Sequence, residues 1–141
     1  MKWLILLMVS NLLFPTNSSV SIEVNGLKNH KGQLLVAFFK NEDGFPNKSE
    51  KAFLRKAVKI KSANNIIVLN DIPTGDYAVS IAHDENMNGK IDYYFIQVPK
   101  EGYGFSNIKK PGLFIPAFSK SKISISKRAN HIKIPLYYFR N

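Results

Sequence analysis

The chain has 141 residues, of which 45% are hydrophobic, carries ten net positive charges and contains no cysteine. This length fits one domain with a core of its own, and the lack of cysteine excludes disulfides, zinc–thiolate sites, thiol nucleophiles and acylation of an N-terminal cysteine. The lysines are scattered and form no nucleic-acid motif, so a nucleic-acid partner is not expected. An anionic polysaccharide or another cell-surface component stays open as a partner.

The first nineteen residues have the layout of a secretory signal peptide. Lys2 precedes an apolar stretch from Trp3 to Phe14, Pro15 ends this stretch, and small polar residues follow as far as Ser19. The apolar stretch is too short and too interrupted to span a membrane well. We therefore expect residues 1–19 to be removed on export. Residues 20–141 should then form a single domain without a transmembrane segment, in the periplasm or at the surface or outside of a bacterium.

The remainder of the chain consists of short runs that are typical of β-strands. Val20–Val24, Tyr77–Ile81 and Ile132–Tyr138 alternate apolar and polar residues, whereas Gln33–Phe39 is apolar on both faces and predicts a central strand. Further runs bring the count to seven or eight strands: residues 58–61, 66–69, 93–98 and 123–125. Without sustained helical periodicity, this pattern predicts an all-β fold, a Greek-key β-sandwich of immunoglobulin-like or transthyretin-like type.

The densest polar segment begins where the 77–83 strand ends. Oxygen-bearing side chains recur along it, at Asp84, Asn86, Asn88 and Asp92. Calcium takes six to eight oxygen ligands, and EF-hand loops supply them at similar spacing, with a glycine for the sharp turn and then a backbone carbonyl. Gly89 and Lys90 stand at those two places. The pattern predicts a calcium site at residues 84–92, to which Glu85 or Glu101 would add further ligands.

The same segment also fits a loop that is capped by its own side chains. The bidentate glutamate expected at the twelfth position of an EF-hand loop is Phe95 here, and no helices flank the segment. Asn and Asp side chains commonly accept hydrogen bonds from the backbone of their own turn. The sequence leaves both interpretations open.

Catalytic groups are not indicated by the sequence. His83 and Asp84 are neighbours on a strand and so point to opposite faces, Ser106 lacks the context of a nucleophile, and the three histidines lack zinc-site spacing. Because His83 shares the parity of Tyr77, we expect its ring to point inward, beneath the 84–92 loop, and to bond the backbone of that loop. These features favour an accessory or binding module over an enzyme.

Two aromatic residues near the middle of the chain have two interpretations. Tyr103 and Phe105 are expected to pack over one end of the sandwich, or else to form a platform on which sugar rings stack beside nearby lysines. The second interpretation predicts a cell-surface, carbohydrate-interacting protein as an alternative function. An enzyme is the remaining alternative.

Four stretches carry a resemblance to a known family: residues 69–79 (LNDIPTGDYAV), 83–92 (HDENMNGKID), 99–107 (PKEGYGFSN) and 116–118 (PAF). Through them, the chain resembles the uncharacterised family of small exported bacterial proteins known as domain of unknown function 2141. The resemblance implies a signal peptide and a transthyretin-like or immunoglobulin-like sandwich, and it implies no established activity.

Overall fold

The structure is a computed structural model that describes residues 16–61, 65–94, 98–110, 112 and 114–139. Within these ranges, one sheet has the order β4-β1-β8 and consists of β1 (Asn17–Asn25), β4 (Ile66–Pro73) and β8 (Asn130–Pro135). The second sheet has the order β3-β2-β5-β6, with β7 also paired to β5. Its strands are β2 (Gln33–Phe39), β3 (Leu54–Lys59), β5 (Gly75–Asp84), β6 (Tyr103–Phe105) and β7 (Lys122–Ile125). Two short helices are η1 (Ser49–Lys51) and α1 (Phe118–Ser121).

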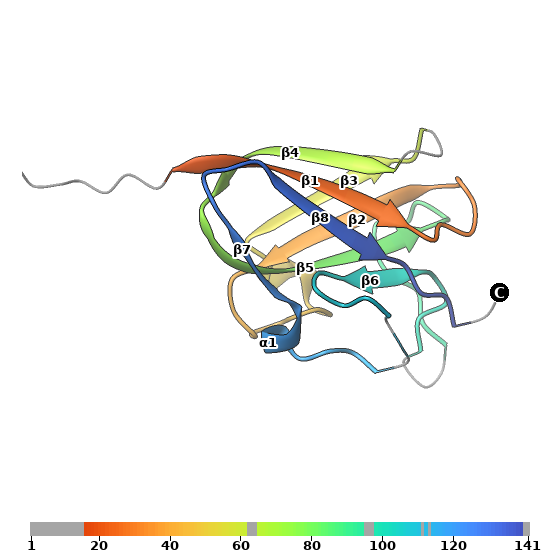
Figure 1. The fold of residues 1–141 in the computed structure, drawn as a ribbon. Helices are drawn as coiled ribbons and strands as arrows, with labels where there is room; N and C mark the ends of the chain where they lie inside the picture. Colours follow the sequence, from red (N-terminus) through yellow and green to blue (C-terminus); the bar gives the residue numbers. More distant parts are fainter. Residues whose placement is uncertain (1–15, 62–64, 95–97, 111, 113, 140–141) are drawn as a thin grey trace, which may run out of the picture.

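The core lies between the two sheets, which face each other in Figure 1. Successive side chains of a strand point to opposite faces, so the alternating apolar residues of β1 (Val20, Ile22 and Val24) all enter the core. Their counterparts on the second sheet are Leu34, Val36, Phe38, Tyr77, Val79 and Ile81. Each large apolar side chain buried in this way stabilises the fold by about 1.5–3 kcal/mol. The all-β, two-layered sandwich that the sequence predicts is therefore confirmed.

The first and last strands of the described chain lie side by side. β1 pairs antiparallel with β4 on one side and parallel with β8 on the other. β8 is an edge strand that ends with Pro135, and an edge is a position in a sheet where proline is tolerated. The finer assignment of this topology as Greek-key, immunoglobulin-like or transthyretin-like stays a prediction.

β2 is apolar on both faces, and its outer face is covered at the Phe39 end but only half-buried at Leu35. One face enters the core, and the other carries Phe39 into an aromatic cluster on the outer side of the second sheet. The ring of Phe45 is the centre of that cluster, with centroids 5.4 Å from Phe39, 5.8 Å from Phe118 and 5.9 Å from Phe105. β2 lies between β3 and β5, so the expected central strand is confirmed.

The expected export signal, residues 1–19, overlaps the first residues of the described chain. β1 begins at Asn17, so a cleavage near Ser18 or Ser19 would fall within this strand, and residues 1–15 lie outside the described part. The expected strand at residues 93–98 also falls partly outside it, at residues 95–97. Among the described residues, no helix is long and apolar enough to cross a membrane.

Candidate functional site

The segment that the sequence singled out forms a tight loop at the end of β5. Asp84 is the last residue of that strand, and its side chain is fully buried on the outer face of the second sheet. Beyond it the backbone turns twice through the left-handed region, at Met87 (φ 59°) and at Gly89 (φ 79°). Gly89 therefore supplies the sharp turn that the sequence predicts, since glycine adopts a positive φ without steric cost.

The carboxylate of Asp84 organises the first half of the loop. Its Oδ1 accepts a hydrogen bond from the backbone N–H of Asn88 at 3.1 Å, and its Oδ2 accepts one from the N–H of Gly89 at 2.8 Å. The side-chain amide of Gln33, on the adjacent strand β2, donates to the same Oδ2 at 2.8 Å. A buried carboxylate is tolerated only when it is paired or hydrogen-bonded, and these three donors meet that need.

Asp92 holds the second half of the loop. Its carboxylate accepts hydrogen bonds from the side-chain amides of Asn86 (2.7 Å) and Asn88 (2.9 and 3.0 Å). The hydrogen bond from Asn86, which has the largest effect, and the hydrogen bond from Asn88 lower the pKa of Asp92 below its usual value. The Oδ1 of Asn88 in turn accepts from the backbone N–H of Lys90 at 3.0 Å.

The structure thus gathers the four predicted side-chain ligands of calcium into one network. Asp84, Asn86, Asn88 and Asp92 are joined to one another through hydrogen bonds within the loop, while Lys90 takes part through its backbone N–H and not through the carbonyl that the calcium pattern assigns to it. In this arrangement the loop caps itself. Turning either asparagine amide over exchanges its N–H₂ for its oxygen, and it also gives up the bond that this oxygen accepts from the backbone N–H of Asn88 or of Lys90.

The two glutamates near the loop, Glu101 and Glu85, differ in their hydrogen-bond partners. Glu101 is buried, and its carboxylate accepts the backbone N–H groups of Glu85 at 3.1 Å and of Asp92 at 3.2 Å. Glu101 therefore joins the two ends of the loop, and desolvation on burial raises its pKa. The Glu85 side chain instead accepts a bond from the amide of Asn29 at 2.9 Å. Glu101 is the better placed of the two to add a ligand.

An ion in this loop would depend on neutral oxygens as well as on carboxylates. Among the described residues, no group of three or more His, Cys, Asp and Glu side chains gathers in a way that would hold a metal. The loop contributes the two carboxylates of Asp84 and Asp92 and the two amides of Asn86 and Asn88. This mixture of hard oxygen donors fits calcium better than it fits a transition metal.

His83 points inward, as its parity with Tyr77 predicts, and its ring is fully buried. Its Nε2 lies 2.7 Å from the carbonyl oxygen of Lys31, which can only accept, so Nε2 carries the proton. In the neutral ring, Nδ1 then accepts the hydroxyl proton of Tyr138 at 2.6 Å. The Tyr138 oxygen also accepts the N–H of Lys28 at 3.2 Å. The ring thus bonds a loop backbone, that of residues 28–32 rather than that of the 84–92 loop.

The aromatic and hydroxyl residues of β6 and its surroundings are structural. Tyr103 and Phe105 are only 3% and 4% exposed, which leaves no open ring face for a sugar to stack on, and the Tyr103 hydroxyl donates to the carbonyl of Gly112 at 2.6 Å. Ser106 donates to the carbonyl of Ser121 and accepts the N–H of Val79 at 2.8 Å. Its hydroxyl therefore ties β5 to the chain before β7, in agreement with its lack of a nucleophile's context.

Comparison with known proteins places the chain in a family without assigning it an activity. No curated protein and no solved structure matches the chain. A family model described as an uncharacterized protein conserved in bacteria, DUF2141, matches residues 22–133, which include the 84–92 loop and all or part of every strand. The chain therefore belongs to the DUF2141 family.

Proposed function

We propose that this protein is an exported, non-catalytic binding module whose 84–92 loop takes up one calcium ion. The observation that carries the proposal is the convergence of Asp84, Asn86, Asn88 and Asp92 in a single hydrogen-bonded network around a glycine turn. Export rests on the N-terminal segment, and the absence of catalysis is supported by the structural bonds that occupy His83 and Ser106.

The same network explains how one loop can exist with and without the ion. Without calcium, the amides of Asn86 and Asn88 neutralise the Asp92 carboxylate by donating to it. With calcium, the ion would take over that role, and the amide oxygens would turn toward it. Two or three carboxylates make a modestly charged site, so we expect a Kd on the order of 10⁻⁴–10⁻³ M, which is typical of extracellular calcium modules.

Thermal unfolding of the protein in chelator and in millimolar calcium tests this proposal. An ion that binds only the folded state stabilises it by about 1.4 kcal/mol when its concentration is tenfold above Kd. We expect calcium to raise the melting temperature of the wild-type protein and magnesium to raise it far less. Asp92→Asn should abolish the rise, because it removes a half-buried carboxylate ligand and replaces it with a side chain of the same size.

A matched control comes from strand β4. Asp71 is an exposed aspartate at a positive φ of 60°, a conformation that asparagine also tolerates, and it lies outside the loop. Asp71→Asn removes the same charge and should keep the full calcium response. An absent response in the wild-type protein, or an equal one in both variants, would refute the calcium site.

A further inference from the structure

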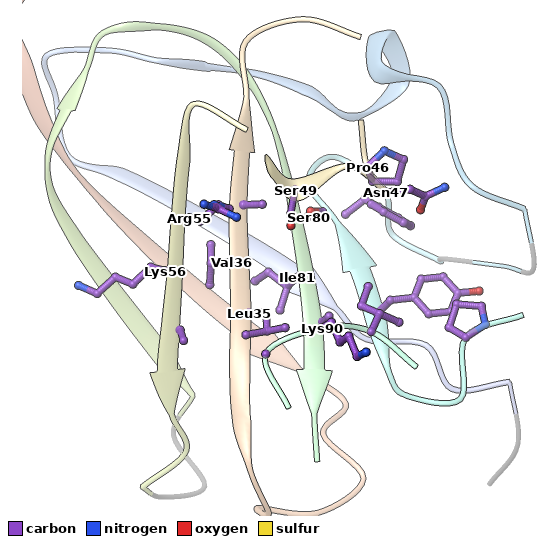
Figure 2. Close-up of a pocket in the computed structure, with 18 of the residues that line it drawn as sticks. Leu35, Val36, Pro46, Asn47, Ser49, Arg55, Lys56, Ser80, Ile81 and Lys90 are labelled. Atoms are coloured by element: carbon purple, nitrogen blue, oxygen red, sulfur yellow. The ribbon is translucent and has the colours of Figure 1, made fainter. Parts of the chain in front are cut away.

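The outer face of the second sheet carries a groove of about 700 Å³. The segment from Pro46 to Glu50 borders one side, and residues Gly89 to Tyr93, the far half of the candidate calcium loop, border another. Figure 2 shows the lining side chains of β2, β3 and β5 between these segments. This volume lies within the range of about 300–1,000 Å³ that is usual for small-molecule sites.

Strand register divides the floor of the groove into two rows. In the first row, Ala37 of β2 pairs with Arg55 of β3 and with Ser80 of β5. In the second row, Leu35 pairs with Ala57 and Ala82. Paired residues point to the same face, so the first row has a cation and a hydroxyl, whereas the second row is wholly aliphatic.

Two residues of the aliphatic row, Leu35 and Ala57, are less covered by the described chain than Phe39 is, while Ala82 is buried. At the Phe39 end of β2, the ring of Phe45 packs over the sheet, while Leu35, four residues earlier on the same face, is only half-buried and faces the groove. A sheet face open to water ordinarily carries polar residues, so an apolar stretch of this kind marks a binding surface.

The charges around the groove favour an anion. Arg55 and Lys90 line it, against Glu50 as the acidic residue among the described lining residues. Within the described chain, Arg55 makes no ion pair. Lys56 belongs to the rim, but in Figure 2 its side chain extends away from the sheet, which makes Arg55 the cation best placed over the floor.

We propose that the groove binds a small amphipathic anion, an aliphatic chain that ends in one acidic group, as in a fatty acid. The acidic group lies at the Arg55 row, where the hydroxyls of Ser49 and Ser80 add donors, and the chain lies over the row of Leu35. An aliphatic floor suits an alkyl chain, and the cation beside it suits an acidic group at the end of that chain.

Calorimetric titration of the full-length protein with dodecanoate, in chelator so that the result is independent of calcium, tests the inference. We expect one dodecanoate per chain and weaker binding of dodecanol, which has the same chain without the charge. Arg55→Gln should weaken dodecanoate binding about tenfold and leave dodecanol unaffected, since a charge-assisted hydrogen bond of about 1.4 kcal/mol is a tenfold change in affinity.

Two further variants keep the test decisive. Lys56→Gln removes the neighbouring cation that points away, and it should bind dodecanoate like the wild-type protein. Ala57→Phe fills the aliphatic row from an exposed position on β3, so the fold should persist while both probes lose binding. The inference is overturned if dodecanoate does not bind, if Ala57→Phe binds it normally, or if an acidic peptide or a uronic-acid oligosaccharide binds in its place.

Discussion

At the scale of single residues, the polar groups inside this protein are held by partners far away in the sequence. His83 is clamped between Lys31 and Tyr138, and Glu101 reaches back to the backbone of Glu85. Sequence reasoning placed His83 inward because parity on a strand is a local property. It did not identify Tyr138 as the partner, since 55 residues separate the two and only the fold brings them together.

The hydrogen bonds of His83 predict that replacing Tyr138 destabilises the protein. Tyr138→Phe removes the hydroxyl that donates to the buried His83 ring and accepts from Lys28. Leaving a buried polar group unsatisfied costs about 1–3 kcal/mol, so the free energy of unfolding should fall by that amount in denaturant titration. Tyr137→Phe is the control, because no hydrogen bond joins the Tyr137 hydroxyl to a described residue. Equal stability of the two variants would contradict the role assigned to Tyr138.

The same tyrosine predicts a dependence on alkaline pH. Burial raises the pKa of Tyr138 to about 12, whereas an unfolded tyrosine titrates near about 10. The folded state therefore holds the proton more tightly. Its contribution to stability is complete below the unfolded pKa and is lost as the pH rises through that of the folded state. The melting temperature of the wild-type protein should fall more steeply across this window than that of Tyr138→Phe, and parallel curves would argue against the assignment.

At the scale of elements, the alternation of side chains predicted β1, β2 and β5, but it placed β3 (Leu54–Lys59) at residues 58–61, missed β6 (Tyr103–Phe105) and did not indicate which strands pair. β1 and β5 follow from alternating apolar residues, and the double-sided run of β2 predicted its central place. The parallel pairing of β1 with β8 could not be predicted, because alternation indicates which face is buried but not which strand lies alongside. The oxygen cluster at residues 84–92 was predictable because a tight loop brings its own side chains together.

Replacing each of three glycines by alanine should affect the stability of the protein to a different degree. A Cβ on Gly32, at φ 73°, would overlap the carbonyl oxygen of Asp84. A Cβ on Gly89, at φ 79°, would meet open space, and one on Gly112 would meet open space at an ordinary φ. In calcium-free denaturant titrations, we expect Gly112→Ala to be neutral, Gly89→Ala to lose about 1–2 kcal/mol from the left-handed backbone, and Gly32→Ala to lose more. A reversed order would contradict the packing of the 28–32 turn on the end of β5.

At the scale of the whole molecule, the proposed calcium loop and the proposed groove have residues in common. Residues 89–92 belong to the calcium loop, and Gly89, Lys90 and Ile91 also line the groove. On β5, Asp84 of the loop and Ala82 of the groove floor are two residues apart on one face. An ion that fixes the loop would therefore fix one side of the groove.

These shared residues predict positive cooperativity between the binding of calcium and the binding of dodecanoate. Dodecanoate should bind more tightly in saturating calcium than in chelator, and calcium should bind more tightly in saturating dodecanoate by the same factor, because coupling between sites is reciprocal. Calorimetric titration in both orders measures the two factors. Equal affinities for dodecanoate in the presence and absence of calcium would show that the shared residues do not couple the two sites.

The central claim, that the 84–92 loop binds calcium, is tested most directly by backbone amide NMR spectra recorded during a calcium titration. The account predicts saturating shifts at the amides of Asn88, Gly89 and Lys90, which now bond the loop's own oxygens, and at that of Asp92, which bonds Glu101, with a Kd on the order of 10⁻⁴–10⁻³ M. Spectra of Asp92→Asn should not change. Wild-type spectra that stay constant in calcium, or that shift only at residues away from this loop, would contradict the account and leave a loop that is capped solely by its own side chains.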